Sequence, residues 1–134
     1  MEYDLCRTLA EISGHIASSP AGRPLFAYAL PQNLHMSHVR SRPVPEGERY
    51  DGFVAPLAAE VHRLDACFGS FVDDLKRRGR YDTSIIVLTA DHGDSLGEDG
   101  QWGHSYTLVP EVVSIPLIVH LPAALTGEQA ADVD

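Results

Sequence analysis

The sequence predicts an α/β protein in which short apolar strands alternate with amphipathic helices. Three apolar runs have the length and composition of strands, at about residues 24–30, 84–90 and 115–121. Two longer stretches, at about 3–17 and 54–78, carry their apolar side chains at helical spacing. This alternation is typical of an open sheet covered by helices, because each element buries its apolar face against another.

Both helices are predicted from their periodicity and from the residues that end them. In the first helix Leu5, Leu9 and Ile12 share one face, and Pro20 stops the chain shortly after the last turn. In the second helix an apolar stripe continues over several turns and Gly79 follows as a C-terminal cap. We expect this longer helix to pack its apolar face on the sheet.

The run at 84–90 is nearly continuous in apolar and β-branched residues. Such a run is typical of a strand buried on both faces, and therefore of a parallel or central strand. We expect Ile85 and Val87 to be buried, and the strands at 24–30 and 115–121 to lie in the same sheet.

Composition limits the class of protein. The chain of 134 residues carries 10 Lys and Arg against 19 Asp and Glu, a net charge of −9. We expect one partial domain over residues 1–134, with neither nucleic acid nor an anionic membrane surface as a partner. No run is long and apolar enough to span a bilayer, and Met1–Asp4 does not begin a signal peptide, so the localisation stays unknown.

The two cysteines, Cys6 and Cys67, match neither a disulfide framework nor a CxxC metal clip. The sequence therefore predicts two buried thiols.

The chemistry is expected directly after the strand at 84–90. There Asp91 and His92 supply a carboxylate and an imidazole, which are suitable ligands for a divalent cation, and Gly93 lets the backbone turn at once. The alternative from spacing alone is that Asp91 caps a turn and His92 makes a local hydrogen bond.

Several segments resemble the sulfatase family of the alkaline-phosphatase-like superfamily. Residues 83–98 are similar to its strand that ends in T-S-D-H-G-x-x-L-G-E, and Trp102–His104 resembles its W-[AG]-[KH] element. Glu111–Val119 resembles E-x-x-x-V-P-L-I-V, and Leu25–His38 resembles the strand and histidine loop upstream. The resemblance implies a partial alkaline-phosphatase-like sheet from the C-terminal half of a catalytic domain.

The same resemblance implies a role for each matching residue. Asp91 and His92 would bind a divalent metal ion, either calcium or manganese, magnesium or zinc. His104 would contact the anionic head of the ester, and His35 the leaving-group oxygen; His38 is the alternative for this second role.

The implied function is metal-dependent hydrolysis of sulfate or phosphate esters of small molecules, glycans or lipids. The alternatives are a phosphoglycerol- or phosphoethanolamine-type transferase of the same superfamily, or a truncated fragment without catalysis. Full-length relatives are often exported or membrane-tethered.

The nucleophile-bearing half of the family's domain finds no match in the chain. Ser19 fits S-x-A-x-R, but it comes directly before a predicted strand rather than opening a helix. We therefore expect the isolated chain to be inactive, and its exposed sheet edge to favour self-association.

Overall fold

The computed structural model describes residues 4–20, 22–35, 44–49, 54–105 and 107–125. The chain divides into two compact units, the first ending at Leu75 and the second beginning at Lys76.

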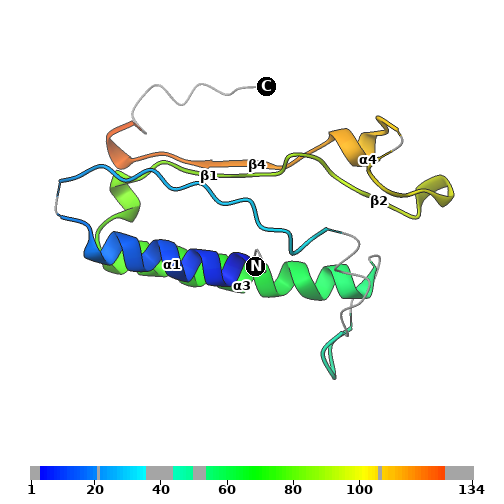
Figure 1. Cartoon of the computed structure of the whole chain (residues 1–134), viewed down its shortest axis with the longest axis horizontal. Coiled ribbons are helices and arrows are strands. Elements are labelled where there is room, and N and C mark those ends of the chain that lie inside the picture. The colour runs from blue at the N-terminus through cyan, green and yellow to red at the C-terminus, as the bar shows by residue number, and fades with distance from the viewer. Residues whose placement is uncertain (1–3, 21, 36–43, 50–53, 106, 126–134) are drawn as a thin grey trace. The chain divides into compact units, whose positions relative to one another are not determined.

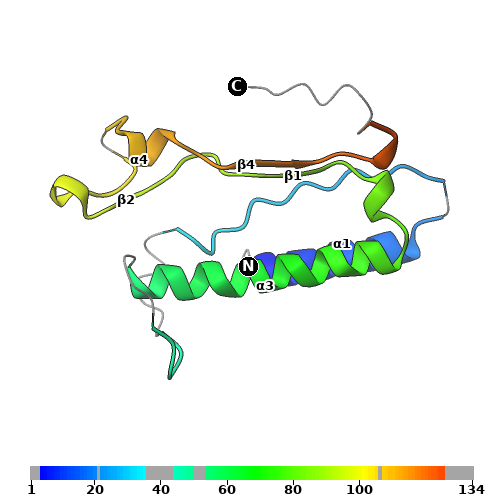
Figure 2. The same cartoon turned by 180° about the vertical axis from the view of Figure 1, so that it is seen from behind.

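The described part of the first unit contains helices α1 and α3. Helix α1 spans Leu5–Ser18 and helix α3 spans Ala55–Arg77, so both expected helices are confirmed with ends shifted by one or two residues. They lie side by side and run in the same direction (Figures 1 and 2). Asp4 caps α1, because its carboxylate accepts a hydrogen bond of 3.1 Å from the backbone N–H of Arg7.

The predicted strand at 24–30 is wrong. The segment is extended, but it joins no ladder among the described residues, and Phe26 and Tyr28 are 89% and 76% exposed. It returns instead toward the start of α1 (Figure 1), where Asn33 accepts a hydrogen bond from the backbone N–H of Leu5 at 2.8 Å. Aromatic and apolar composition suits a strand, but it does not provide the neighbouring strand that a sheet requires.

The prediction of two free thiols is also wrong. Cys6 of α1 and Cys67 of α3 form a disulfide, with an S–S distance of 1.98 Å and their Cα atoms 5.3 Å apart. Pairing depends on which helix faces lie together, and a separation of 61 residues gives no indication of that.

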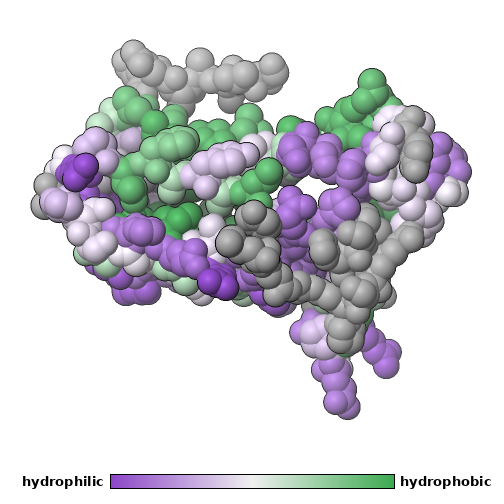
Figure 3. Space-filling view, viewed as in Figure 1, coloured by the Kyte–Doolittle hydropathy of each residue, from purple (hydrophilic) through white to green (hydrophobic). Residues whose placement is uncertain are grey.

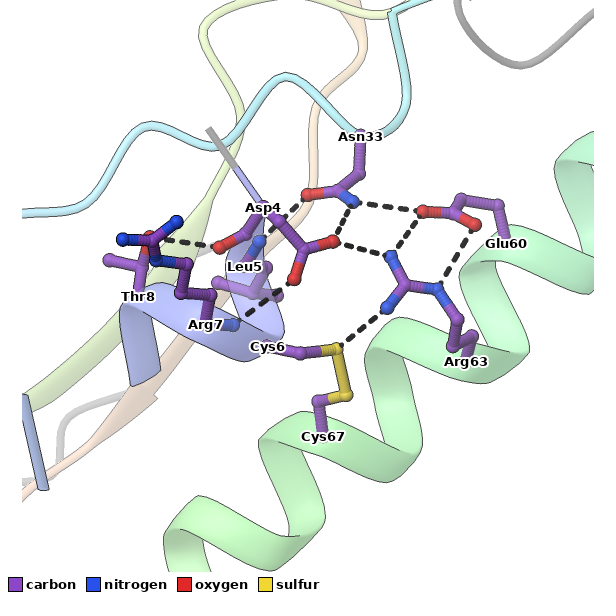
Figure 4. Close-up of polar contacts among 9 residues, drawn as sticks. All are labelled: Asp4, Leu5, Cys6, Arg7, Thr8, Asn33, Glu60, Arg63 and Cys67. Atoms are coloured by element: carbon purple, nitrogen blue, oxygen red, sulfur yellow. Dashed lines mark hydrogen bonds and ion pairs between the residues drawn. A yellow bond between two sulfur atoms is a disulfide. The ribbon is translucent and has the colours of Figure 1, made fainter. Parts of the chain in front are cut away.

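A polar network surrounds the disulfide (Figure 4). Arg63 pairs with Asp4 and with Glu60, each at 2.7 Å, and donates to Cys6 Sγ at 3.0 Å. The amide of Asn33 donates to both carboxylates, at 2.8 and 2.9 Å. Asn33 and Glu60 are each only 4% exposed, so these contacts satisfy polar groups whose burial would otherwise be costly.

This network predicts an acid-sensitive first unit. Burial alone raises the pKa of Asp4, but hydrogen bonds from Asn33 and Arg63 outweigh it and lower the pKa from 3.8 to about 2. The stabilisation is therefore complete above pH 3.8 and is lost as the pH falls toward 2. We expect Asp4→Asn to remove about 1–2 kcal/mol of this acid dependence.

Urea unfolding of the first unit across that pH range measures the effect. Glu11→Gln is the control, since Glu11 is 60% exposed and pairs only with Arg7 among the ion pairs described here. An equal acid dependence in wild type and Asp4→Asn would contradict the prediction.

The second unit contains two small antiparallel sheets within residues 76–105 and 107–125. Strand β1 (Ile86–Thr89) pairs with β4 (Leu117–His120), and β2 (Ser95–Leu96) pairs with β3 (Trp102–Gly103). Helix α4 (Pro110–Val113) lies between β3 and β4 in the sequence. Single 3₁₀ turns cover Tyr81–Thr83, Glu98–Gly100 and Ala123–Leu125.

The predicted strands at 84–90 and 115–121 do share a sheet, and the α/β class is confirmed. They are antiparallel, however, and not buried: Ile85 is 61% and Val87 is 55% exposed. Apolar surface gathers over β1 and β4 in the space-filling view (Figure 3). A strand is buried on both faces only where other layers cover it, and this two-stranded ribbon leaves its side chains accessible.

The longer helix buries part of its expected face. Leu64 and Leu75 are 7% and 3% exposed, but Val61 is 45% exposed. Its packing on the sheet and the single-domain organisation stay predictions. None of the helices in the described part of the chain has the length and apolarity that a membrane crossing requires.

Candidate metal centre

A short β-hairpin places Asp94 and His104 opposite each other. Ser95 of β2 pairs with Gly103 of β3, so Asp94 and His104 are the next residues at the open end of the hairpin. The Nδ1 atom of His104 lies 2.8 Å from Oδ1 of Asp94. The side chains are 27% and 17% exposed, respectively, so solvent screens this contact only partly.

His92 completes a group of three. Its ring contacts the ring of His104 in a tilted arrangement, with centroids 3.8 Å apart and planes inclined by 33°. One ligand atom from each of His92, Asp94 and His104 lies within 4.8 Å of the other two. Two ligands on one cation can be separated by up to about 4–4.6 Å, twice a metal–ligand distance of about 2.0–2.3 Å. The donor set therefore fits a single ion with small adjustments.

Local hydrogen bonding assigns the tautomer of His92. Its Nδ1 lies 2.9 Å from the carbonyl oxygen of Gly93, which can only accept, so Nδ1 carries the hydrogen. In the neutral ring the lone pair is then on Nε2, the atom that a metal ion would bind. Nε2 lies 3.8 Å from Oδ1 of Asp91.

Asp91 makes the local contact that was the alternative to metal binding. Its Oδ1 accepts a hydrogen bond of 3.1 Å from the backbone N–H of His92, which is the turn-capping contact. The carboxylate is nevertheless 62% exposed and next to the His92 imidazole, so its oxygens are accessible to a cation.

Gly93 fixes the backbone under these ligands. Its N–H donates to the carbonyl of Val112 at 2.7 Å, which ties the end of β1 to α4. A Cβ at this position would overlap the carbonyl oxygen of Glu111. The close approach of two backbones explains why a residue without a side chain occupies this position.

The other predicted residues are only partly described. His35 belongs to the first unit, where its backbone N–H donates to the Gln32 carbonyl at 3.2 Å, and His38 lies outside the described residues. Ser19 follows α1 directly and its hydroxyl donates to the His15 carbonyl at 2.8 Å, a helix-ending role.

Sequence reasoning missed Asp94. The signal was its place in the hairpin: glycines at 97, 100 and 103, all with positive φ, permit a tight return that aligns position 94 with position 104.

Comparison with known proteins adds independent findings. A family model described as Sulfatase matches residues 2–133. The chain is 32% identical over 77 residues to an N-acetylglucosamine-6-O-sulfatase of Bacteroides thetaiotaomicron, covering 58% of this chain and 14% of that protein. It is 31% identical over 105 residues to lipoteichoic acid synthase 2 of Bacillus subtilis, covering 67% and 16%.

A third match is to the low-salt glycan biosynthesis sulfotransferase Agl7 of Haloferax volcanii. The identity is 39% over 54 residues, which cover 37% of this chain and 13% of that protein. The chain thus matches less than a fifth of the length of each of these relatives.

Proposed function

Because this chain belongs to the sulfatase family, and so to the alkaline-phosphatase-like superfamily, we propose that it supplies part of the active site of a metal-dependent sulfate ester hydrolase. The family is metal-dependent, and a His and Asp group able to hold an ion is present in the second unit. The observation that carries the proposal is the meeting of His92, Asp94 and His104 beside Asp91.

Asp91 and His92 are the proposed metal ligands. The support is chemical: an exposed carboxylate lies next to an imidazole whose Nδ1 is already used by the Gly93 carbonyl. A hydrogen bond from the other ring nitrogen to a backbone carbonyl orients a metal-binding histidine. When bound, the ion supplies Lewis-acid polarisation of an ester oxygen. A mixed nitrogen and oxygen donor set favours manganese or zinc over calcium.

His104 and His35 are the proposed contacts to the ester. The support for His104 is its ring contact with His92, one of the proposed metal ligands, at 3.8 Å between centroids. Hydrogen-bond donors aimed at developing negative charge are worth about 2.7–4 kcal/mol each in acyl transfer, and we propose a comparable role here. For His35 the support is its place in the family-like histidine loop alone.

A phosphoglycerol-type transferase is the second candidate. It is favoured by the match to a lipoteichoic acid synthase over 105 residues, and by a histidine at 104 in the W-G-H element. In either case the substrate would be a small-molecule, glycan or lipid ester. We also propose that the exposed ribbon of β1 and β4 favours self-association of this chain.

We predict that His92→Ala weakens Mn²⁺ binding to the 134-residue chain at least about tenfold, because it removes one ligand. Isothermal titration with Mn²⁺ and with Ca²⁺ measures this. His15→Ala is the matched control, since His15 is an exposed imidazole of α1 in the other unit.

Equal Mn²⁺ affinity in wild type and His92→Ala would overturn the metal assignment. With diamagnetic Zn²⁺ in place of Mn²⁺, which would broaden the His104 ring signals, methyl sulfate and glycerol phosphate can be compared by the shifts they cause in those signals. A response to methyl sulfate supports the hydrolase, and a response confined to glycerol phosphate supports the transferase.

A further inference from the structure

We propose that Asp94 is a positioning residue that fixes the tautomer and direction of the His104 ring. The inference rests on the proposed function for the role of His104, but the arrangement itself is independent of a metal ion. It starts from a contact within the hairpin that the family resemblance did not assign.

The first step is the chemistry of the contact. Oδ1 of the ionised Asp94 carboxylate is 2.8 Å from Nδ1 of His104, and an ionised carboxylate can only accept hydrogen bonds. The hydrogen therefore resides on Nδ1 of His104. In the neutral ring the lone pair is on Nε2, so Nε2 is the atom that takes up a proton, and only the protonated ring donates from Nε2 to an oxygen of the ester.

The second step is orientation. An Nδ1 contact fixes one point of the ring but leaves it able to rotate about that point. The tilted contact with the His92 ring, with centroids 3.8 Å apart, limits rotation of the ring as well. With both restraints the direction of Nε2 is set before any substrate binds, which reduces the entropy lost on binding.

The third step is the support for Asp94 itself. It lies next to Ser95, which is 1% exposed and paired with Gly103 in the ladder. Gly93 on its other side is bonded to the Val112 carbonyl. The carboxylate is thus carried by backbone that is held on both sides. A carboxylate behind a histidine is a common device for fixing which ring nitrogen acts.

His120, in the same unit, is an internal reference with the opposite tautomer. Nε2 of His120 lies 3.0 Å from the Tyr81 carbonyl, so that ring carries its hydrogen on Nε2. Its ring stacks on Tyr81 at 3.8 Å, so it too is held in place. His104 and His120 should therefore show opposite tautomers in one sample.

Nitrogen-15 NMR of the histidine rings in the metal-free 134-residue chain tests the proposal, at a pH where the rings are neutral. We expect His104 to be the Nδ1–H tautomer and His120 the Nε2–H tautomer. In Asp94→Ala, His104 should lose its single tautomer and give a mixture, while His120 is unchanged. Asp94→Asn should restore Nδ1–H, because its amide oxygen can accept the same hydrogen bond.

Two results would overturn the proposal: an Nε2–H tautomer of His104 in the wild-type chain, or an unchanged Nδ1–H tautomer in Asp94→Ala. If the alanine variant does not fold, the tautomer of His104 in the wild-type spectrum still tests the proposal. Added Mn²⁺ separates this inference from the proposed function. Correct tautomers without broadening of His92 signals would reject only the metal site, and broadening with the wrong His104 tautomer would reject only the role of Asp94.

Discussion

Gly93→Ala should disrupt the candidate metal centre and destabilise the second unit by about 3 kcal/mol, near the upper end for overpacking. A Cβ at this position overlaps the Glu111 carbonyl oxygen and lies 3.2 Å from its carbonyl carbon and 3.5 Å from the Val112 Cα. All three are backbone atoms, so no side-chain rotation can relieve the overlap. The backbone at Gly93 must move away from the backbone at Glu111 and Val112. The 2.7 Å hydrogen bond from the Gly93 N–H to the Val112 carbonyl is then lost.

Hydrogen exchange of the second unit and the His92 ring signals measure this effect. Gly14→Ala is the matched control, because Gly14 lies within α1 and a Cβ there meets nothing within 4 Å. The control should stabilise its helix by about 1 kcal/mol, since alanine is the better helix former. Wild-type exchange rates near β1 in Gly93→Ala would contradict the prediction.

The helices were predictable because their signals are local. The apolar period of α1 and the prolines and glycines that follow each helix depend only on neighbouring residues. Gly79 illustrates this: it lies two residues after the end of α3, has a φ of +62°, and donates its N–H to the Lys76 carbonyl. A glycine that ends a helix acts through its own backbone conformation, which does not depend on the rest of the fold.

The strands were predictable in position but not in partner or burial. The segments around Val87 and Val119 do form strands, and they pair with each other. A run of apolar residues is compatible with a buried strand. Burial itself requires other layers of the protein to cover the strand. The segment at 24–30 has the same composition, yet it joins no ladder among the described residues.

Spacing alone pointed only to candidate ligands that are close in the sequence. Asp91 and His92 were proposed because they are adjacent and follow a predicted strand, and their metal role stays a prediction. The contact of Asp94 with His104 spans ten residues and depends on the hairpin register. Register follows from turn geometry, which spacing alone does not give.

The disulfide shows the same limit at longer range. The residues next to each cysteine in the sequence do not predict a disulfide. Only the side-by-side placement of α1 and α3 brings Cys6 and Cys67 together (Figure 4). Arg63 then serves both features, since it contacts Cys6 Sγ and joins the carboxylates of Asp4 and Glu60. Its pKa is raised above the usual range by the Glu60 hydrogen bond, against the effect of burial, and the charge stays fixed.

Reduction of the Cys6–Cys67 disulfide should therefore have the largest effect on stability, about 4 kcal/mol for the first unit. The bridge closes a separation of 61 residues, and the entropy removed from the unfolded chain grows with the logarithm of that length. Urea unfolding with and without a phosphine reductant measures the change. Cys6→Ser, Cys67→Ser and the double variant should all match the reduced wild type, because each lacks the same bridge.

The double variant also provides the control, since the reductant has no bond to break in it and should leave its unfolding midpoint unchanged. Arg63→Ala in the oxidised chain separates the bridge from the network beside it. That change removes the 2.7 Å ion pair of Arg63 with the Glu60 carboxylate, which is 4% exposed, and should destabilise the unit even with the disulfide intact. A shift of less than about 1 kcal/mol on reduction would show that the helices are held together by the Arg63 network rather than by the bridge.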